Sequence, residues 1–289
     1  MLALLNTASY ISNSQVLTIT GTELMNSAKP YYISPAFAFV AYPNRDSTPF
    51  REWYGIPEAE TVVRGTLRYQ GFPEFISALV KLGWLDQTEK GWLKEGITWR
   101  QITQVLLGIN IQDESTESFL VEHIKARVEF PNESEAERII SGLRWIGTFS
   151  NDPAQLRAGT LLDTLCARLE VLMKYDAGER DLVMLQHKFL VEWADGTEVS
   201  NWKDSDAMRS NLVLQQTLTS TLETYGSKTP GGYSAMALTV GVPCGIATQL
   251  ILDGVLKEPG VHAPYTPEVC DPLRKELEAE GLGLIERAL

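Results

Sequence analysis

The spacing of apolar residues changes twice along this chain, and that change most constrains its fold. In residues 1–72, and again from residue 179, short runs of β-branched and aromatic residues have the alternation typical of strands. Between them, apolar residues recur every three or four positions, which is the spacing of amphipathic helices. This order predicts the α/β (α+β) class, with a mixed β-sheet domain that is flanked by helices and interrupted by an all-helical subdomain.

We divide the chain into three segments on this basis. Residues 1–72 are the first part of the mixed α/β domain, and residues 73–178 are the helical subdomain. Residues 179–289 are the second part of the α/β domain, followed by C-terminal helices. The expected strands are at residues 16–20, 37–42, 61–70, 181–193 and 217–224.

Cap residues indicate where helices start. About five helices are expected in the helical segment, and Thr98, Ser134 and Thr160 are the predicted starts of three of them. Residues 2–8 resemble the tail of a helix that has no cap before it. We therefore expect the sequence to begin inside a longer protein, as a fragment of it.

Two helices are predicted in the last segment. The first spans residues 231–254 and is expected to be interrupted near Pro243, because proline breaks a helix interior. The second spans residues 271–280, with Pro272 in its first turn. The apolar part of the first helix is shorter than the roughly 20 residues of a membrane span. No membrane partner is therefore expected.

Composition excludes some classes of partner. The 289 residues carry a formal net charge of −12, which repels polyanions, so no nucleic acid partner is expected. The amino terminus has no basic segment of a secretory signal, which predicts a cytoplasmic protein. Three cysteines and three histidines, all widely spaced, predict neither disulfides nor a metal site.

Two motifs place arginines where they could bind an anion. In the run from residue 64 to residue 73, Arg64, Thr66 and Arg68 alternate on a predicted strand and would share one face. A guanidinium group grips a carboxylate bidentately, and a hydroxyl between two guanidinium groups could complete a carboxylate site. Arg45, in a polar loop, could add a third cation. The alternative is that these arginines form structural ion pairs.

The same motifs carry a resemblance to a known family. The sequence contains, in this order, the runs YPNRDSTPF, IPEAETVVRGTLRYQGFPEF, ERIISGLRWIG, LDTLCARLE, GERDLVMLQHKF, GGYSAMALTVG and HAPYTPEVCDPL. It thereby resembles the fungal saccharopine reductases, the glutamate-forming saccharopine dehydrogenases, from residue 23 to the end. The resemblance implies a cytoplasmic enzyme of lysine biosynthesis that is a homodimer.

The resemblance also implies chemistry. L-glutamate condenses with 2-aminoadipate semialdehyde, and NADPH reduces the imine to saccharopine. By matching motifs, contacts with saccharopine are carried onto Arg45, Thr66, Leu67 and Arg68, with Leu67 contributing backbone groups. Arg64 is added from the strand geometry alone. No catalytic acid or base is assigned.

The nucleotide-binding part of the family is missing from this sequence. A Rossmann domain requires a G-x-G-x-x-G run after a strand, and no such run occurs here. We therefore expect NADP(H) to bind to the full-length family enzyme but not to this chain alone, which would be inactive. The alternative is a non-catalytic fragment that dimerises or binds dicarboxylates.

Three further features of the sequence carry expectations. A hairpin turn is predicted at residues 194–197, and the polar residues 199–215 are an insertion relative to the family, for which we hypothesise a retained intron or a surface loop. His187 is expected to be a hydrogen-bonded core residue, with a general-acid role left open. Four tryptophans are expected in the helical core: Trp84, Trp92, Trp99 and Trp145.

Overall fold

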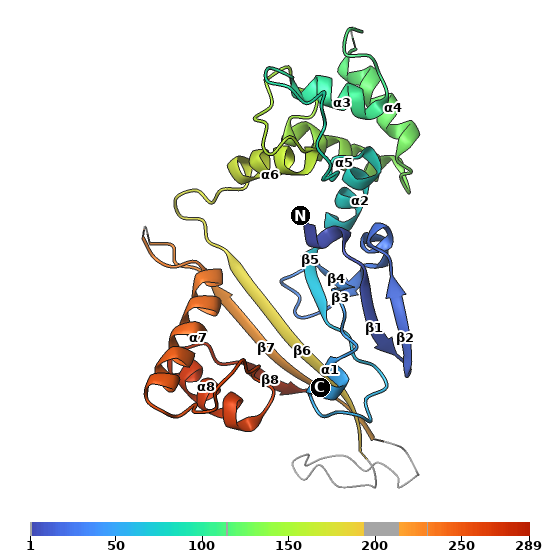
Figure 1. Cartoon of the computed structure of the whole chain (residues 1–289). Helices are drawn as coiled ribbons and strands as arrows, with labels where there is room; N and C mark the ends of the chain where they lie inside the picture. The colour runs from blue at the N-terminus through green and yellow to red at the C-terminus, as the bar shows by residue number, and fades with distance from the viewer. Residues whose placement is uncertain (1, 114, 194–213, 230) are drawn as a thin grey trace. The chain divides into compact units, whose positions relative to one another are not determined.

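The computed structural model describes residues 2–113, 115–193, 214–229 and 231–289 (Figure 1). The chain divides into two compact units, residues 1–174 and residues 175–289. Each unit is described by itself. The mixed α/β class is confirmed, and the β-structure lies in three small sheets.

The first unit begins with short strands. A 3₁₀ helix, η1 (Leu2–Leu5), precedes a hairpin of β1 (Ala8–Ser12) and β2 (Gln15–Ile19). The turn residues Asn13 and Ser14 have positive φ values of 49° and 62°, as two-residue hairpin turns require. The predicted helix tail at residues 2–8 is therefore wrong beyond one 3₁₀ turn, because Ala8 already pairs with Ile19.

A three-stranded antiparallel sheet follows in the order β3-β4-β5. Its strands are β3 (Lys29–Tyr31), β4 (Phe39–Pro43) and β5 (Gly65–Tyr69). Short helices occupy the connections, namely η2 (Gly21–Glu23), η3 (Met25–Ser27) and α1 (Phe50–Trp53). The expected strand at residues 61–70 is thus only five residues long, and Arg64 lies just before it.

The five helices expected in the helical segment are confirmed. They are α2 (Phe72–Leu82), α3 (Trp99–Leu107), α4 (Glu117–Arg127), α5 (Glu133–Ile146) and α6 (Leu161–Leu172). Thr98 caps α3 in a capping box with Gln101, and Thr160 caps α6, as predicted. For α5 the cap is Asn132, two residues before the predicted Ser134.

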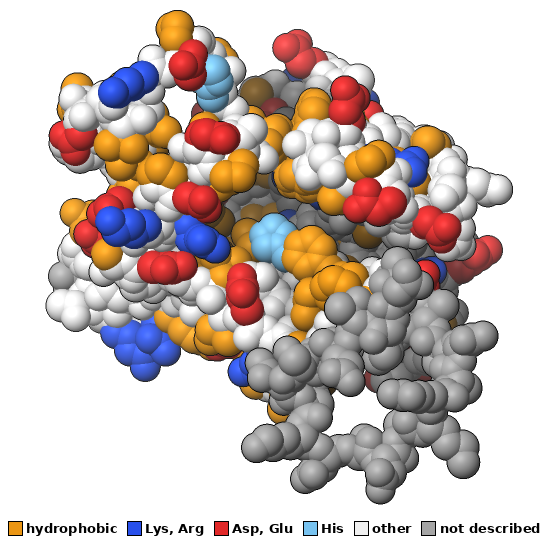
Figure 2. Space-filling view, turned by 90° about the horizontal axis from the view of Figure 1, so that it is seen from below, with side chains coloured by type: hydrophobic (Ala, Val, Ile, Leu, Met, Phe, Trp, Pro, Cys, Tyr) orange, Lys and Arg blue, Asp and Glu red, His pale blue; other side chains and the backbone are white. Residues whose placement is uncertain are grey.

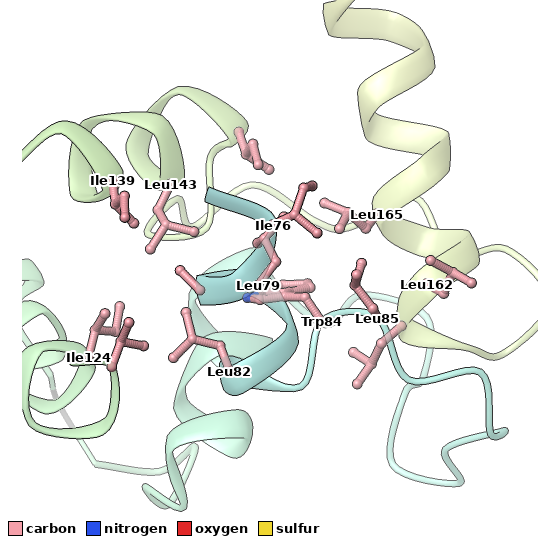
Figure 3. Close-up of a cluster of buried hydrophobic side chains, with 14 of the residues drawn as sticks. Ile76, Leu79, Leu82, Trp84, Leu85, Ile124, Ile139, Leu143, Leu162 and Leu165 are labelled. Atoms are coloured by element: carbon pink, nitrogen blue, oxygen red, sulfur yellow. The ribbon is translucent and has the colours of Figure 1, made fainter. Parts of the chain in front are cut away.

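These helices pack around α2. Figure 3 shows Leu79 and Leu82 of α2 and the adjoining Trp84 among side chains from α4, α5 and α6. The rings of Trp84 and Trp99 are 5.7 Å apart and both are buried, which confirms two of the four predicted core tryptophans. Trp92 is partly buried against the core. Trp145 is 54% exposed, because it lies one residue before Ile146 on the face of α5 that turns away from the core.

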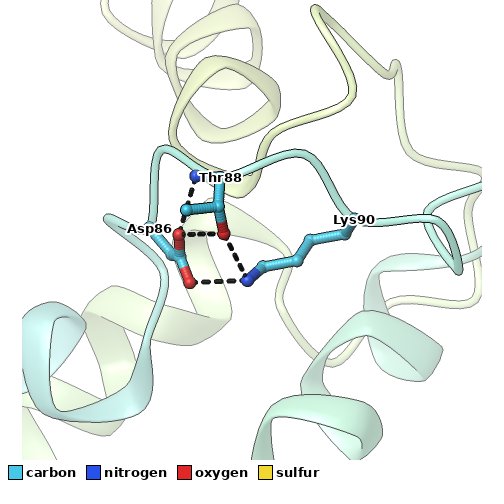
Figure 4. A network of polar contacts seen from close by, with 3 residues as sticks. All are labelled: Asp86, Thr88 and Lys90. Carbon is cyan, nitrogen blue, oxygen red and sulfur yellow. Dashed lines mark hydrogen bonds and ion pairs between the residues drawn. The ribbon is translucent and has the colours of Figure 1, made fainter.

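Side-chain hydrogen bonds stabilise the loop that follows α2. Figure 4 shows the carboxylate of Asp86, which accepts hydrogen bonds from the Thr88 backbone N–H (2.8 Å) and hydroxyl (2.7 Å) and pairs with the Lys90 ammonium (2.7 Å). The Lys90 bond, followed by those of Thr88, lowers the pKa of Asp86 to about 2.

The second unit contains a sheet in the order β6-β7-β8 and two helices (Figure 1). The strands are β6 (Leu182–Trp193), β7 (Leu214–Tyr225) and β8 (Ile285–Ala288), and all pairs are antiparallel. The two predicted strands are confirmed; β6 matches its predicted range to within one residue, and β7 is longer than expected. The predicted turn at residues 194–197, and the insertion up to residue 213, lie outside the described residues.

The helices of this unit are α7 (Ala235–Leu252) and α8 (Pro267–Ala279). The predicted interruption of α7 is wrong, because the helix continues through Pro243, which removes only one backbone donor. α8 starts at Pro267, so Pro272 lies inside it rather than in its first turn. Among the described helices, α7 alone is long and apolar enough to cross a membrane, judged by length and composition; such a lone helix is weak evidence of a span.

The start of α7 is bonded to the start of β6. Asp181 accepts hydrogen bonds from the backbone N–H groups of Ala235 (2.7 Å) and Met236 (2.9 Å), which have no partner within the helix. Gly226 donates to the Asp181 carbonyl at 3.0 Å. A Cβ atom at Gly226 would lie 2.2 Å from the Asp181 carboxylate and 3.0 Å from the Ala235 nitrogen, so a side chain there would displace the carboxylate from the helix start.

Candidate functional site

The β4–β5 pair positions most of the predicted site residues. In its register Tyr42 faces Thr66 and Val40 faces Arg68, so Thr66 and Arg68 share one side of the sheet. Both side chains are half-buried. Leu67, between them, faces the other side, so only its backbone groups can serve the Thr66 side. The structure therefore brings Thr66 and Arg68 together as predicted.

The two strand arginines are held by different aromatic rings. The Arg68 guanidinium lies 5.3 Å from the centre of the Phe72 ring and donates to the Leu67 carbonyl at 2.9 Å. The Arg64 guanidinium lies 4.1 Å from the centre of the Phe50 ring. A cation over an aromatic ring is stabilised by about 0.5–1 kcal/mol at an exposed site. Each arginine therefore packs on its own aromatic ring, and the two guanidinium groups do not form one carboxylate site around Thr66.

The expected alternative, structural ion pairs, is not what holds these arginines. Within the described part of the chain, the ion pairs involve other arginines and lysines, and none includes Arg45, Arg64 or Arg68. A guanidinium that lacks a carboxylate partner in the protein can accept one from a ligand.

Tyr42 is a member of this group that the sequence analysis did not identify. Its side chain is buried and lies opposite Thr66 in the ladder. Burial raises the pKa of Tyr42, while the charge of Arg68 and a hydrogen bond with Thr66 act in the opposite direction. The phenol is therefore neutral at pH 7 and can hydrogen-bond to Thr66. Only the pairing of β4 with β5 places Tyr42 opposite Thr66, and the sequence alone does not give this pairing.

Arg45 lies in the loop directly after β4. Its φ of 55° is in the left-handed region, which costs a residue other than glycine about 1–2 kcal/mol. Strained backbone positions cluster at functional sites and ligand clamps. The side chain is exposed, and Asp46 shapes the loop by accepting hydrogen bonds from the Thr48 N–H (2.9 Å) and hydroxyl (2.7 Å).

The ladder separates the two cations. Arg68 pairs with Val40, and Arg45 is five residues further along the same strand direction, so their Cα atoms are separated by at most about 17 Å at the rise of a β-strand. Two arginines separated along the strand direction suit a ligand with carboxylates at separate ends better than a single carboxylate held by both.

His187 does not belong to a buried site within its unit. It is exposed on β6, 6.5 Å from the ring of Phe189, which is also exposed. The expectation of a core histidine is therefore wrong here. Strand alternation showed that these residues share a face, but it does not show whether that face is covered.

The described residues offer no group for a metal ion, and one face of the molecule carries mixed charges. They contain no group of three or more histidine, cysteine or carboxylate side chains that could hold a metal ion. On the face drawn in Figure 2, acidic and basic side chains are interspersed with apolar ones.

Comparison with known proteins places this geometry in a family. Residues 1–282 match the family described as the saccharopine dehydrogenase C-terminal domain. The saccharopine dehydrogenases [NADP(+), L-glutamate-forming] of Schizosaccharomyces pombe and Saccharomyces cerevisiae are each 46% identical to the chain over its whole length. The mitochondrial alpha-aminoadipic semialdehyde synthase of Bos taurus is 29% identical over 98% of the chain and 28% of its own length.

The fold is similar to that of a solved structure. The apo histidine-tagged saccharopine dehydrogenase (L-Glu forming) from Saccharomyces cerevisiae matches with a TM-score of 0.86 and 46% identity over the whole chain. This chain belongs to the saccharopine dehydrogenase family and matches its C-terminal domain. It spans 60% of the length of the two yeast relatives and 60% of the solved chain.

Proposed function

We propose that this chain is the saccharopine-binding part of an NADP-dependent, L-glutamate-forming saccharopine dehydrogenase of lysine biosynthesis. The observation that carries the proposal is that Arg68 lies on β5, Arg45 lies in the loop directly after its partner strand β4, and neither forms an ion pair within the described residues. Saccharopine has carboxylates at both ends, which suits two cations that are well separated.

Each residue of the site has a distinct role in this proposal. Arg68, half-buried and supported by Phe72, binds a carboxylate bidentately. The Thr66 hydroxyl and the backbone groups of Leu67 bind polar atoms of the same part of the ligand. Arg45 binds the carboxylate at the other end. Arg64 contributes a more distant positive charge, because its guanidinium already lies on Phe50.

The proposed reaction needs a hydride donor in addition to these residues. NADPH supplies the hydride that reduces the imine formed between L-glutamate and 2-aminoadipate semialdehyde. The sequence contains no glycine-rich dinucleotide motif, so the cofactor is bound by protein outside this chain, and the chain alone is inactive. Its own residues bind and orient the carboxylates while the neutral Tyr42 holds Thr66.

Further proposals follow from the family resemblance, the composition and the sequence pattern. The working protein is a cytoplasmic homodimer that binds neither nucleic acid nor a membrane, and a net charge of −12 supports the first of these exclusions. Residues 1–72 and 179–289 serve one α/β domain, with residues 73–178 as its helical insertion. The competing function is a non-catalytic, dicarboxylate-binding dimerisation fragment.

Calorimetric titration of the purified chain with saccharopine tests the leading proposal. We expect binding that Arg68→Ala weakens at least tenfold, because a charge-assisted bidentate pair is lost. Arg144→Ala is the matched control, since Arg144 pairs with Glu117 on the helices and should leave binding unchanged. Equal affinities for wild type and Arg68→Ala would refute the assignment. Oxidation of NADPH by this chain alone would refute the expected lack of activity.

A further inference from the structure

The loop that carries Arg45 is fixed by a buried serine. Ser47 has no exposed surface, although serine is usually found outside. Its hydroxyl oxygen accepts a hydrogen bond of 2.9 Å from the backbone N–H of Arg64. A side chain of the loop therefore bonds to the backbone that leads into β5, the strand of Thr66 and Arg68.

The backbone of the loop is bonded on both sides. Toward β5, the Asn44 N–H donates to the Arg64 carbonyl at 2.9 Å. Toward β1, the Ser47 N–H donates to the Ser9 carbonyl at 2.7 Å, and the Ser9 N–H donates to the Arg45 carbonyl at 2.8 Å. The residues on both sides of Arg45 in the chain are thus held by hydrogen bonds to neighbouring strands.

These bonds explain how Arg45 keeps its left-handed conformation. A residue other than glycine would leave that region unless its surroundings fixed it. Three of the bonds are between backbone groups, which are available to any sequence. The bond from the Ser47 side chain is the part that depends on residue type, and without it the part-buried Arg64 N–H would lack this partner.

We propose that Ser47 is a positioning residue, which holds Arg45 in its left-handed turn at a fixed place relative to β5 and so sets the separation of the two carboxylate-binding arginines. This inference rests on the proposed function. Ser47 itself does not touch the ligand, since its side chain is fully buried. It acts through the geometry of Arg45.

Limited trypsin digestion tests the positioning without any ligand. The bonds Arg45–Asp46 and Arg180–Asp181 join the same two residue types in different units, so the second is an internal control. We expect Ser47→Ala to speed cleavage after Arg45 about tenfold, because the loop opens more often, and to leave cleavage after Arg180 unchanged. Unchanged cleavage after Arg45, or equal acceleration at both bonds, would overturn the inference.

Saccharopine titration tests the consequence for binding. We expect Ser47→Ala to lower affinity about tenfold in the wild-type background and less than twofold in an Arg45→Gln background, because Ser47 acts only through Arg45. A purely structural role would lower affinity equally in both backgrounds. Ser27→Ala is the matched control; it removes the hydrogen bond of 2.7 Å from Ser27 to the Leu24 carbonyl and should change neither readout.

A second variant covers the case in which Ser47→Ala fails to fold. Ser47→Cys keeps the shape of the side chain but replaces the hydroxyl oxygen by a weak acceptor. It should give faster cleavage after Arg45 and lower saccharopine affinity than wild type, and wild-type values for Ser47→Cys would overturn the inference. If wild-type chain does not bind saccharopine, the proposed function fails, while the digestion result still decides whether Ser47 fixes the loop.

Discussion

The helical part of the first unit and helix α7 of the second unit differ in how their apolar residues are used. In α5 apolar and polar positions alternate with the helical period, and Ile139, Leu143 and Ile146 are buried. In α7 apolar residues occupy every side, and of its 18 residues only Ala235 and Leu250 are buried. The spacing of apolar residues therefore predicts which side of a helix is buried only where one side is apolar and the other is polar.

The largest expected effect is a core substitution in the helical part. Leu143→Ala should lower the free energy of unfolding by about 3 kcal/mol, since it leaves a cavity among packed side chains. Val240→Ala on α7 is the control and should change it by less than about 0.5 kcal/mol, because Val240 is 61% exposed. Urea unfolding followed by circular dichroism measures both, and similar losses would contradict the contrast.

The junction where α7 meets β6 is expected to be less tolerant than the helix itself. Gly226→Ala should cost about 2–3 kcal/mol, because the new Cβ would push into the Asp181 carboxylate. Gly245→Ala, in open space on α7, should stabilise the helix by about 0.5–1 kcal/mol. Thermal unfolding of the two variants measures both changes in stability. Two changes of the same sign would show that the contacts of Gly226 do not make the start of α7 less tolerant than the rest of the helix.

The capping carboxylate should make the junction sensitive to acid. Burial raises the pKa of Asp181, but the backbone hydrogen bonds from Met236 and Ala235 outweigh this, so the pKa lies below its usual value. A lowered pKa means that the stabilisation is present above the unfolded-state pKa and is lost as the pH falls through the folded-state pKa. Asp181→Asn should cost about 1 kcal/mol at pH 7 and less in acid, as measured by urea titrations at both pH values.

Asp86 gives the smallest effect, in the loop shown in Figure 4. Its pKa of about 2 predicts stabilisation that is complete above the usual carboxyl range near 4 and declines as the pH falls toward 2. Because the side chain is 37% exposed, solvent screening limits the contribution to about 1 kcal/mol. Asp86→Asn should remove this dependence of unfolding on pH, and an unchanged acid profile would show that the loop network does not stabilise the unit.

Local sequence patterns predicted most helices and strands, but the pairing of strands into sheets could not be predicted from them. Thr98 and Thr160 identified helix starts because capping depends on adjacent residues alone. The residues around Arg64 were predicted as strand from their β-branched neighbours, yet β5 begins at Gly65, where pairing with Pro43 starts. Pairing involves distant residues, which a local pattern does not contain.

The candidate site shows the same division. The two motifs supplied Arg45, Thr66 and Arg68, and the register places the last two on one side of the sheet. Neither Tyr42 nor Ser47 could be found in this way, because each acts through a partner more than 15 residues away. Their burial and hydrogen bonds are properties of the folded chain.

A saccharopine titration of four proteins tests the central claim, that Arg45 and Arg68 bind separate carboxylates. Wild type, Arg45→Ala, Arg68→Ala and the double variant would be compared by calorimetry. The account predicts that each single change weakens binding and that the two losses in binding free energy add within about 0.5 kcal/mol, as for independent contacts. A double variant that binds no more weakly than either single variant would contradict it, because the two arginines would then hold one carboxylate together.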